Sequence, residues 1–248
     1  MKRIVGIIPA RYQSSRFPGK PLVPLLGKPM ILYVAEITAC ALGKKNTWVA
    51  TDDQRIADVV ESAGFNVVIT SGMALTGTDR VWETAMQVKA DIYVNIQGDE
   101  PLLNPKDIDL IVAEKKKRGR GIVNGMIRLL PHEDPSNVNI PKVITTENHR
   151  MVYMSRSAIP GFKSYHNKPE YYMKQVCIYA FTYEELEAFG EFGRKSILEK
   201  HEDIEILRYL DLSIPVFMVE TDGTSLAVDI PEDVPVVEEA LRRRQEKE

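Results

Sequence analysis

Short apolar runs rich in β-branched residues alternate along this chain with segments whose apolar residues recur at helical spacing. The apolar runs are typical of buried strands and comprise Ile4–Ile8, Thr47–Ala50, Val67–Thr70, Ile92–Ile96, Val123–Ile127, Val176–Phe181 and Val216–Glu220. Between several of them lie the segments with helical spacing, at Met30–Cys40, Gln54–Ala63, Thr78–Lys89 and Pro105–Lys117. Strands and helices that alternate in this way form βαβ units, so the sequence predicts an α/β fold around a mostly parallel sheet.

The second half of the chain has a less regular pattern. Residues 131–175 are rich in Pro, Asn, Tyr and His, which predicts an inserted lobe or long loops. A helical pattern follows at roughly Leu198–Asp211, and Pro231 suits the first turn of a last helix. The length of 248 residues fits one domain over residues 1–248, or a core that carries a smaller lobe.

Charge and composition exclude several classes of protein. The formal net charge is −3, whereas a general nucleic-acid-binding surface needs an excess of Lys and Arg. We expect no membrane span and no secretory signal, because the apolar runs are too short for either. Cys40 and Cys177 lack the spacing of a zinc site, and we expect two reduced thiols in a cytoplasmic protein.

A loop with three cations follows the first predicted strand. The segment Ile8–Leu22 contains Arg11, Arg16 and Lys20 together with two serines and a glycine. In open α/β sheets ligands bind outside the carboxyl ends of the strands, and such a loop can present backbone N–H groups and positive charge to a triphosphate. The loop matches neither the Walker A nor the GxGxxG pattern, and a solvated basic loop is the alternative interpretation.

Two acidic segments are candidates for a metal site. The predicted strand before Asp99 and Glu100 runs straight into these carboxylates, and Mg²⁺ favours one or two carboxylates plus substrate phosphates. An ordinary Gly-Asp turn is the alternative there. Asp229 closes another apolar run, and if that run neighbours the strand before Asp99, the two carboxylates can hold one metal ion. Capping of the last helix by Asp229 explains the residue equally well.

Two further segments offer weaker candidates. Thr78 can cap a helix and so present Arg80 to a phosphate. Arg156 can make a bidentate contact with a substrate carboxylate. Surface ion pairs are the alternative for both arginines. The four histidines have no ligand spacing among themselves, so none is assigned to a metal or to general base catalysis.

Eight ordered segments together resemble one family. They are IPARYQSSRFPGKPL (8–22), ATDD (50–53), TGTDR (76–80), NIQGDEP (95–101), YMSRSAIP (153–160), CIYAF (177–181), EDIEILR (202–208) and VDIPED (228–233). The set resembles the 3-deoxy-manno-octulosonate (Kdo) cytidylyltransferases, or CMP-Kdo synthetases, from end to end of the chain. The resemblance implies a three-layer, Rossmann-like nucleotidyltransferase fold with a mixed, mostly parallel sheet and a smaller dimerisation lobe. It also implies a homodimer and a role in lipopolysaccharide biosynthesis.

The implied reaction joins CTP to a 2-keto sugar acid and releases pyrophosphate. Such a transfer depends on positioning and charge neutralisation and needs no Ser or His nucleophile. By resemblance, the nucleotide side consists of Ala10, Arg11, Ser15, Arg16, Lys20, Thr78, Arg80 and Gln97. Asp99 and Asp229 match the carboxylates that hold Mg²⁺, and they would act in catalysis with Arg11 and Lys20. The sugar-acid side consists of Arg156, Gln175, Tyr179, Glu205 and Arg208.

The chain departs from the family pattern on the sugar-acid side. Gln175 stands where the family usually has His, and Ile206 stands where it usually has Gln. Polar groups that bind a hydroxyl discriminate strongly between substrates, so these changes bear on the acceptor and leave the nucleotide side intact. Kdo is the leading acceptor. The alternatives are another ulosonic acid, such as amino-Kdo or a sialic-acid-like sugar, a phosphonate or sugar phosphate, and a non-catalytic nucleotide-binding relative.

Overall fold

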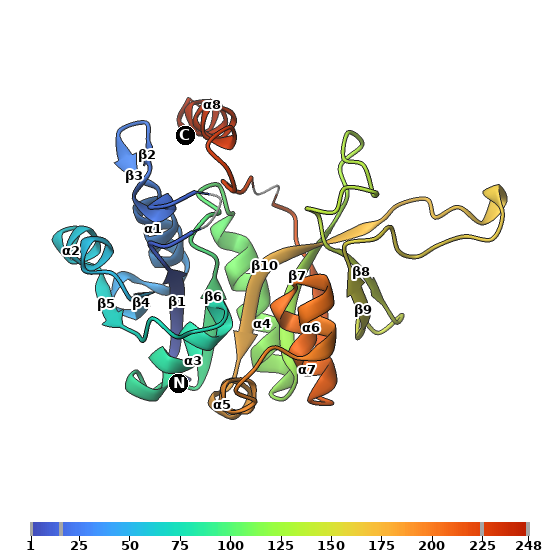
Figure 1. Cartoon of the computed structure of the whole chain (residues 1–248), viewed down its shortest axis with the longest axis horizontal. Helices are drawn as coiled ribbons and strands as arrows, with labels where there is room; N and C mark the ends of the chain where they lie inside the picture. The colour runs from blue at the N-terminus through green and yellow to red at the C-terminus, as the bar shows by residue number, and fades with distance from the viewer. Residues whose placement is uncertain (1, 15–16, 224–225, 247–248) are drawn as a thin grey trace.

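A single mixed sheet forms the centre of the molecule. The structure is a computed structural model that describes residues 2–14, 17–223 and 226–246. The strands along the central path are β1 (Ile4–Ala10), β4 (Thr47–Thr51), β5 (Asn66–Ile69), β6 (Ile92–Ile96), β7 (Ile122–Arg128), β10 (Met173–Phe181) and β11 (Val216–Glu220). They lie in the order β11-β7-β10-β6-β1-β4-β5 (Figure 1). Four of the six neighbouring pairs on this path are parallel, and β10 alone runs antiparallel to both of its neighbours, which confirms the predicted mixed, mostly parallel sheet.

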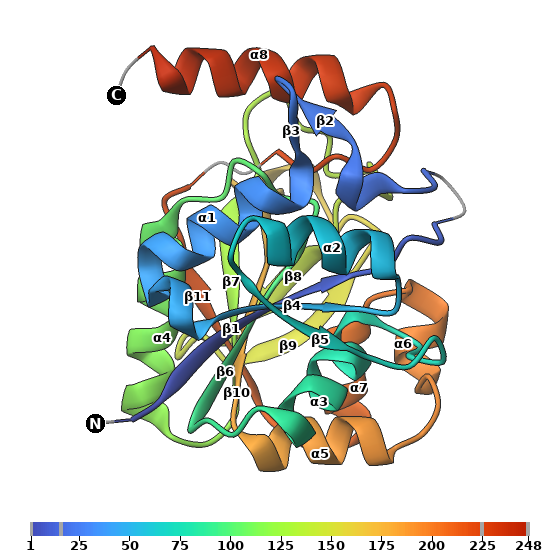
Figure 2. The same cartoon turned by 90° about the vertical axis from the view of Figure 1, so that its left-hand side faces the viewer.

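Helices cover both faces of this sheet. Apolar side chains of α1 (Met30–Leu42), α2 (Gln54–Ser62) and α4 (Pro105–Arg118) pack into one buried cluster. Those of α3 (Gly77–Gln87) and α5 (Tyr183–Glu191) pack into another. Figure 2 shows α3 and α5 on the opposite side of the sheet from α1 and α2. The residues of β1 alternate between the two clusters, with Ile8 in the first and Ile7 in the second, as the pleat of a strand requires. The predicted three-layer α/β architecture is therefore confirmed.

Local sequence signals account for the ends of these helices. Asn104 accepts the backbone N–H of Lys106 at the start of α4, and Pro105 occupies the first helical position, where its missing N–H does no harm. Thr182 and Glu185 form a reciprocal capping box at the start of α5. Gly43 ends α1 with a φ of 84°, as expected for the glycine that follows this helical pattern.

The irregular segment 131–175 contributes two strands and a long arm. β8 (Lys142–Thr145) pairs with β10 and with β9 (Met151–Ser155), so the segment extends the sheet. Between β9 and β10 the chain extends away from the body and carries the short 3-10 helix η3 (Tyr165–Asn167), at the right of Figure 1. The predicted lobe is thus built on the same sheet as the rest of the chain.

The helix expected at Leu198–Asp211 is broken into three short pieces, so this prediction was wrong. They are α6 (Ile197–Glu202), the 3-10 helix η4 (Glu205–Leu207) and α7 (Arg208–Asp211). The break lies at Asp203, which has a φ of 51°, a left-handed conformation that Asp tolerates better than most residues. Main-chain carbonyls at the break accept hydrogen bonds from Arg156, as described below, and these contacts replace the helical ones.

The remaining elements lie near the two ends of the chain. They are the 3-10 helices η1 (Lys20–Leu22) and η2 (Lys44–Asn46), the hairpin of β2 (Pro24–Leu25) and β3 (Lys28–Pro29), and the last helix α8 (Asp233–Gln245). Pro231 precedes α8 and does not occupy its first turn, contrary to the prediction. None of the helices within the described ranges is both long and apolar enough to cross a lipid bilayer.

Candidate active site

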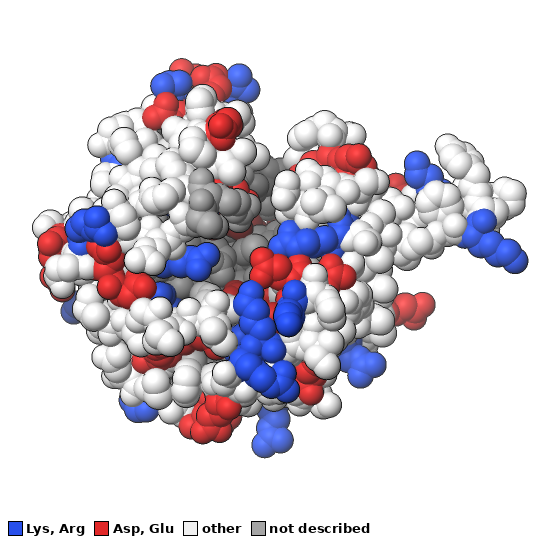
Figure 3. Space-filling view, viewed as in Figure 1, with Lys and Arg blue, Asp and Glu red and all other residues white. Residues whose placement is uncertain are grey.

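A cavity of about 770 Å³ opens at the carboxyl ends of β1 and β6. Its wall combines the loops after these two strands with the start of α3, the end of α6 and the inner face of β10. Basic and acidic side chains gather around the hollow in the middle of the face seen in Figure 3. Ligands of open α/β sheets bind at this edge, so the cavity is where the fold would place a substrate.

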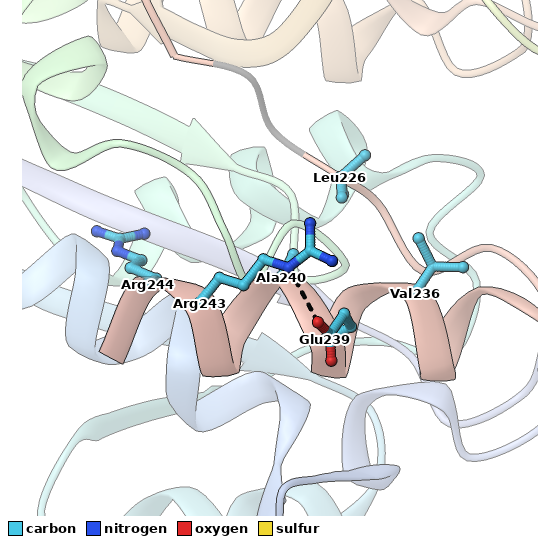
Figure 4. Close-up of a pocket in the computed structure, with 6 residues that line it drawn as sticks. All are labelled: Leu226, Val236, Glu239, Ala240, Arg243 and Arg244. Carbon is cyan, nitrogen blue, oxygen red and sulfur yellow. Dashed lines mark hydrogen bonds and ion pairs between the residues drawn. The ribbon is translucent and has the colours of Figure 1, made fainter. Parts of the chain in front are cut away.

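A second hollow lies along α8, and it is lined by Leu226, Val236, Glu239, Ala240, Arg243 and Arg244 (Figure 4). Its wall is mainly apolar, and the Arg243 guanidinium is paired with Glu239 at 2.9 Å. The convergent polar groups expected of an active site are found in the cavity at the strand ends, which is therefore the candidate site.

The loop after β1 brings the predicted nucleotide-side cations to the cavity. Ala10 is buried at the end of β1, Arg11 follows it at the cavity wall, and Lys20 begins η1. Gly19 has a φ of 71° and donates its N–H to the Tyr12 carbonyl, which closes the loop and turns Lys20 inward. Ser15 and Arg16 lie outside the described residues.

The loop after β6 packs against the loop after β1. A Cβ atom at Gly98 would lie 3.1 Å from the Pro9 carbonyl oxygen, so this close approach favours glycine. Gln97 lines the cavity and donates its amide to Glu205 Oε1 at 3.2 Å. The structure thus brings Gln97 and the predicted sugar-side residue Glu205 into direct contact.

Two carboxylates face one ammonium group at the floor of the cavity. Lys20 Nζ lies 2.6 Å from Asp99 Oδ2 and 3.6 Å from Asp229 Oδ1. The segment around Asp229 is not a strand, contrary to the premise of the metal hypothesis, but the Val228 N–H donates to the Asp99 carbonyl at 2.9 Å. This backbone hydrogen bond takes the place of the expected strand pairing and holds the Asp99 and Asp229 carboxylates side by side.

The alternative interpretation of Asp229, as a cap of α8, does not match the contacts at that helix. The carboxylate of Asp233 accepts the N–H groups of Asp229 and Ile230 at 2.7 and 3.0 Å, so Asp233 satisfies the donors at this turn. The side chain of Asp229 lines the cavity. The described residues contain no cluster of three or more His, Cys, Asp or Glu side chains suited to a metal ion. Asp99 and Asp229 are the two carboxylates that lie within ion-pair distance of Lys20.

Thr78 and Arg80 lie at the start of α3, and the capping role expected of Thr78 was wrong. Thr76, and not Thr78, caps the helix by accepting the Asp79 N–H at 3.2 Å. Thr78 is fully buried, and its N–H donates to Glu205 Oε2 at 3.0 Å. Arg80 reaches the cavity wall, but its guanidinium also contacts the Thr70 hydroxyl and lies 3.2 Å from Asp52. These contacts fix the start of α3 beside the cavity.

Arg156 lies at the rim of the cavity and uses its guanidinium mainly on the protein. Three of its N–H groups donate to the main-chain carbonyls of Glu202, Val138 and Asp203, at 2.5, 2.8 and 3.0 Å. These bonds connect β9 with the break between α6 and η4. The guanidinium has five N–H donors, so no more than two are left for a substrate carboxylate.

Gln175, Tyr179 and Glu205, which the resemblance assigns to the sugar acid, form a polar part of the cavity wall. The Gln175 amide donates to Asn124 Oδ1 at 3.2 Å and to the Tyr179 hydroxyl at 3.0 Å. Burial raises the pKa of the Glu205 carboxyl, even though the Thr78 backbone N–H stabilises its charged form. Burial also raises the pKa of the Tyr179 hydroxyl well above its usual value. This wall therefore offers hydrogen-bond acceptor and donor groups whose positions are held by contacts within the protein.

Two residues assigned to the sugar side by resemblance lie behind the cavity wall. Arg208 has no exposed surface and forms ion pairs at 2.7 Å with Asp79 and Glu199. Ile206 is also fully buried and packs in the same apolar cluster as Tyr209. Of the two departures from the family pattern, Gln175 alone belongs to the cavity wall, and Ile206 belongs to the core.

Sequence reasoning missed Cys177, Lys195 and Asn139, all of which line the cavity. Burial, together with the nearby charge of Glu100, raises the pKa of the Cys177 thiol well above its usual value, so the thiol stays protonated. Lys195 lies 2.7 Å from Asp203 at the rim. In the sequence these residues look like an ordinary strand cysteine and ordinary surface polar residues, and no local signal distinguishes them.

Comparisons with known proteins agree with this geometry. The profile of the family described as "Cytidylyltransferase" matches residues 5–214. A 3-deoxy-manno-octulosonate cytidylyltransferase of Geobacter metallireducens is 40% identical, over 98% of this chain and 99% of the relative. An 8-amino-3,8-dideoxy-manno-octulosonate cytidylyltransferase of Shewanella baltica is 38% identical, over 95% of this chain and 97% of the relative.

A solved structure described as CMP:2-keto-3-deoxy-manno-octonic acid synthetase complexed with CTP superimposes with a TM-score of 0.90. It is 33% identical to this chain, and the match covers 98% of this chain and 99% of the other. Both the family profile and these relatives span most of the sheet, including the strands that carry the cavity. The chain belongs to the cytidylyltransferase family.

Proposed function

We propose that this protein transfers the cytidylyl group of CTP to a 2-keto sugar acid and releases pyrophosphate, with 3-deoxy-manno-octulosonate as the leading acceptor. The relative from Geobacter metallireducens carries this activity in its name, and the related synthetase structure was described with CTP bound. The cavity has the two sides that such a reaction needs, with cations on the β1 loop and fixed polar groups on β10 and η4.

The observation that carries the proposal is the convergence of Asp99 and Asp229 on one cation at the end of β6. Two carboxylates that share a cation fit Mg²⁺, which takes one or two carboxylates and completes its shell with phosphate oxygens and water. Asp99 and Asp229 would hold the ion. Bound there, it would polarise the α-phosphate and lower the pKa of the attacking hydroxyl.

The chain's own residues neutralise charge and position the substrates. CTP brings about four negative charges, and two unit charges at about 4 Å repel by about 4 kcal/mol at an effective dielectric near 20. Arg11 and Lys20 face this charge from the β1 loop. Gln97 is oriented by Glu205, so the nucleotide side and the acceptor side are aligned by one partly buried hydrogen bond. No covalent enzyme intermediate is needed, because positioning and charge neutralisation suffice for transfer between phosphates and hydroxyls.

A second acceptor has support of its own. The relative from Shewanella baltica is named for 8-amino-3,8-dideoxy-manno-octulosonate and is 38% identical to this chain. Gln175 is the polar residue of this wall that departs from the resemblance, and its amide N–H groups are already used by Asn124 and Tyr179. Its carbonyl oxygen is then the group that it offers to a substrate hydroxyl or amine.

An acceptor panel tests the proposal. Purified protein is incubated with CTP, Mg²⁺ and either Kdo, its 8-amino analogue, a sialic acid or a phosphonate, and pyrophosphate release is measured. We expect release with CTP and a ulosonic acid, and little with UTP or ATP. If no acceptor supports pyrophosphate release, the enzymatic proposal fails and a nucleotide-binding role replaces it. If only the phosphonate reacts, the acceptor class is wrong and the transfer chemistry stands.

We further propose that the protein is a homodimer and acts in the cytoplasm, where CTP is available. The arm between β9 and β10 exposes aromatic side chains, including Phe162, Tyr165 and Tyr171, with Tyr165 80% exposed. A group of exposed aromatic residues on an extended segment is typical of a surface that a partner covers. A second copy of the chain is the partner that we propose.

A further inference from the structure

Lys20 occupies the place between the two acidic residues of the site. Its ammonium group contacts Asp99 closely and lies within ion-pair distance of Asp229, and its side chain is only 16% exposed. The Asp99 and Asp229 side chains are 27% and 43% exposed, so water screens them only in part. Two carboxylates held this close repel each other unless a cation lies between them.

The backbone around Lys20 is anchored, so a change of partner would involve its side chain alone. Gly19 turns the chain with its positive φ, the Val23 N–H donates to the Lys20 carbonyl at 3.1 Å, and Pro21 is buried. A lysine carries a compact charge on a flexible four-carbon stem, so it can exchange one anionic partner for another without movement of the backbone. Arg11 lies on the same side of the cavity, where a triphosphate would extend.

We propose that Lys20 takes the place of the divalent cation while the site is empty, and that it leaves the two carboxylates when the metal binds. In the absence of nucleotide, the ammonium group competes with the metal for Asp99 and Asp229. When CTP is bound, the triphosphate offers Lys20 a new partner and the competition ends. Binding of CTP and binding of metal therefore favour each other through one side chain, and this coupling is reciprocal. The inference rests on the proposed function, since it requires both ligands.

Metal binding without nucleotide tests the competition directly. Mn²⁺ is titrated into nucleotide-free protein, and the free ion is followed by electron paramagnetic resonance. We expect Lys20→Met to bind Mn²⁺ with a Kd roughly fivefold lower than that of the unchanged protein, because loss of a partly exposed ion pair is worth up to about that factor. Lys28→Met is the matched control, since Lys28 pairs with Glu36 at 2.5 Å outside the cavity and should leave the Kd unchanged.

Several outcomes separate the inference from the proposed function. Equal or weaker Mn²⁺ binding by Lys20→Met overturns the inference. The double variant Lys20→Met, Asp99→Asn should not show the lower Kd for Mn²⁺ that is expected of Lys20→Met. If the double variant keeps that lower Kd, the ion binds elsewhere and the inference is again overturned. If the unchanged protein releases pyrophosphate and Asp99→Asn loses Mn²⁺ binding while Lys20→Met gains nothing, the proposed function stands and the inference alone fails.

A second measurement needs no variant and so does not depend on whether Lys20→Met folds. Acetylation of lysines by a water-soluble reagent is quantified by mass spectrometry in nucleotide-free protein, with and without saturating Mg²⁺. An ammonium that leaves its carboxylates becomes more reactive, so Lys20 should be acetylated severalfold faster with Mg²⁺, while Lys28 serves as the internal reference. No change at Lys20, or a decrease, contradicts the displacement.

Discussion

Arg208 is a buried charge whose partners come from distant parts of the chain. Asp79 lies near the start of α3 and Glu199 lies in α6, and both carboxylates make hydrogen bonds to the guanidinium. The carbonyl of Phe189 accepts a further bond at 3.1 Å. Together these contacts fix α3, α5, α6 and α7 behind the cavity. At the residue scale, therefore, Arg208 acts through the groups that it positions.

Removal of this guanidinium should destabilise the protein strongly. Arg208→Met leaves Asp79 and Glu199 buried without their cation, and loss of one partner of a buried pair costs about 3–5 kcal/mol. The free energy of unfolding in urea measures the effect. Arg243→Met is the control, because Arg243 is exposed and its pair with Glu239 is worth no more than about 1 kcal/mol. A variant as stable as the parent that has lost only acceptor binding would instead favour direct contact with substrate.

The acidic pair leads to a second prediction at this scale. Asp99→Asn and Asp229→Asn should each nearly abolish pyrophosphate release, because an amide cannot supply the charge that a divalent cation requires. Steady-state turnover with CTP and the best acceptor of the panel measures this loss. Asp109→Asn in α4, which does not line the cavity, is the control. Full turnover by either variant would contradict the assignment of Mg²⁺ to these carboxylates.

At the scale of elements, the end of β9 is fastened to the end of α6. The Glu202 carboxylate accepts the Ser155 hydroxyl at 2.6 Å and the Arg156 N–H at 2.8 Å. In addition, the Arg156 guanidinium donates hydrogen bonds to the main-chain carbonyls of Glu202 and Asp203, at the break after α6. The arm and its strands are thus held to the helical segment that carries Glu205, and the shape of this part of the cavity wall depends on the junction.

The junction should weaken in acid. Burial alone would raise the pKa of Glu202, but the hydrogen bonds from Arg156, Ser155 and Tyr153 lower it below the usual value of 4.5. A lowered pKa in the folded state gives stability that is present above the unfolded value and is lost as the pH falls through the folded value. The loss therefore begins below about pH 4.5. Urea unfolding at pH 7 and pH 3.5 should show a larger loss for the parent than for Glu202→Gln, and equal losses would contradict this account.

Arg156 allows a related prediction. Arg156→Met removes three bonds to main-chain carbonyls, so the segments that supply them should open more often. Hydrogen exchange should therefore increase around residues 137–139 and 202–204, with unchanged exchange in α4 as the internal control. If exchange stays the same while the KM for the acceptor rises, Arg156 binds substrate and does not serve as a clamp.

At the scale of the whole molecule, the cavity lies between two unlike halves of one sheet. The parallel strands β1 and β6, with the loops that follow them, line one side of the cavity, and the antiparallel strand β10 with η4 lines the other. The arm extends from the second half and lies at the right of Figure 1, whereas the hollow lies in the middle of the same face in Figure 3.

The proposed homodimer can be tested on this arm. Tyr165→Asp together with Phe162→Asp places charges on the exposed aromatic surface, so we expect sedimentation equilibrium to shift from dimer to monomer. Val236→Asp is the control, since Val236 is an exposed apolar residue, 60% accessible, on α8, which lies apart from the arm in Figure 1. A dimer that survives the arm variant and dissociates in the control would place the interface on α8.

Most of the fold could be predicted from the periodicity of apolar residues along the chain. Side chains point to a given face at a characteristic interval in a strand and at another in a helix, so the interval indicates both the element and its buried face. The predicted strands and helices before residue 131 agree with the structure to within a few residues at each end. The break at Asp203 was not predictable, since the pattern of apolar residues continues through it. At the break, Arg156, which is distant in sequence, donates hydrogen bonds to the main-chain carbonyls of Glu202 and Asp203, and these bonds take the place of helical ones.

The residues of the candidate site also fall into two groups, those whose place could be predicted from local sequence and those placed by contacts between distant segments. Arg11, Gln97 and Asp99 follow closely after the strands whose ends form the site, and Lys20 lies in the loop after the first of these strands, so their place could be predicted from local sequence. The amino-acid sequence by itself thus determined the α/β architecture and the edge of the sheet at which the cavity lies. Only the tertiary structure decided that Asp229 faces Asp99 across Lys20, that Arg208 and Ile206 lie behind the wall, and that Arg156 holds the lobe. These outcomes depend on contacts between segments far apart in the chain, which local spacing does not encode.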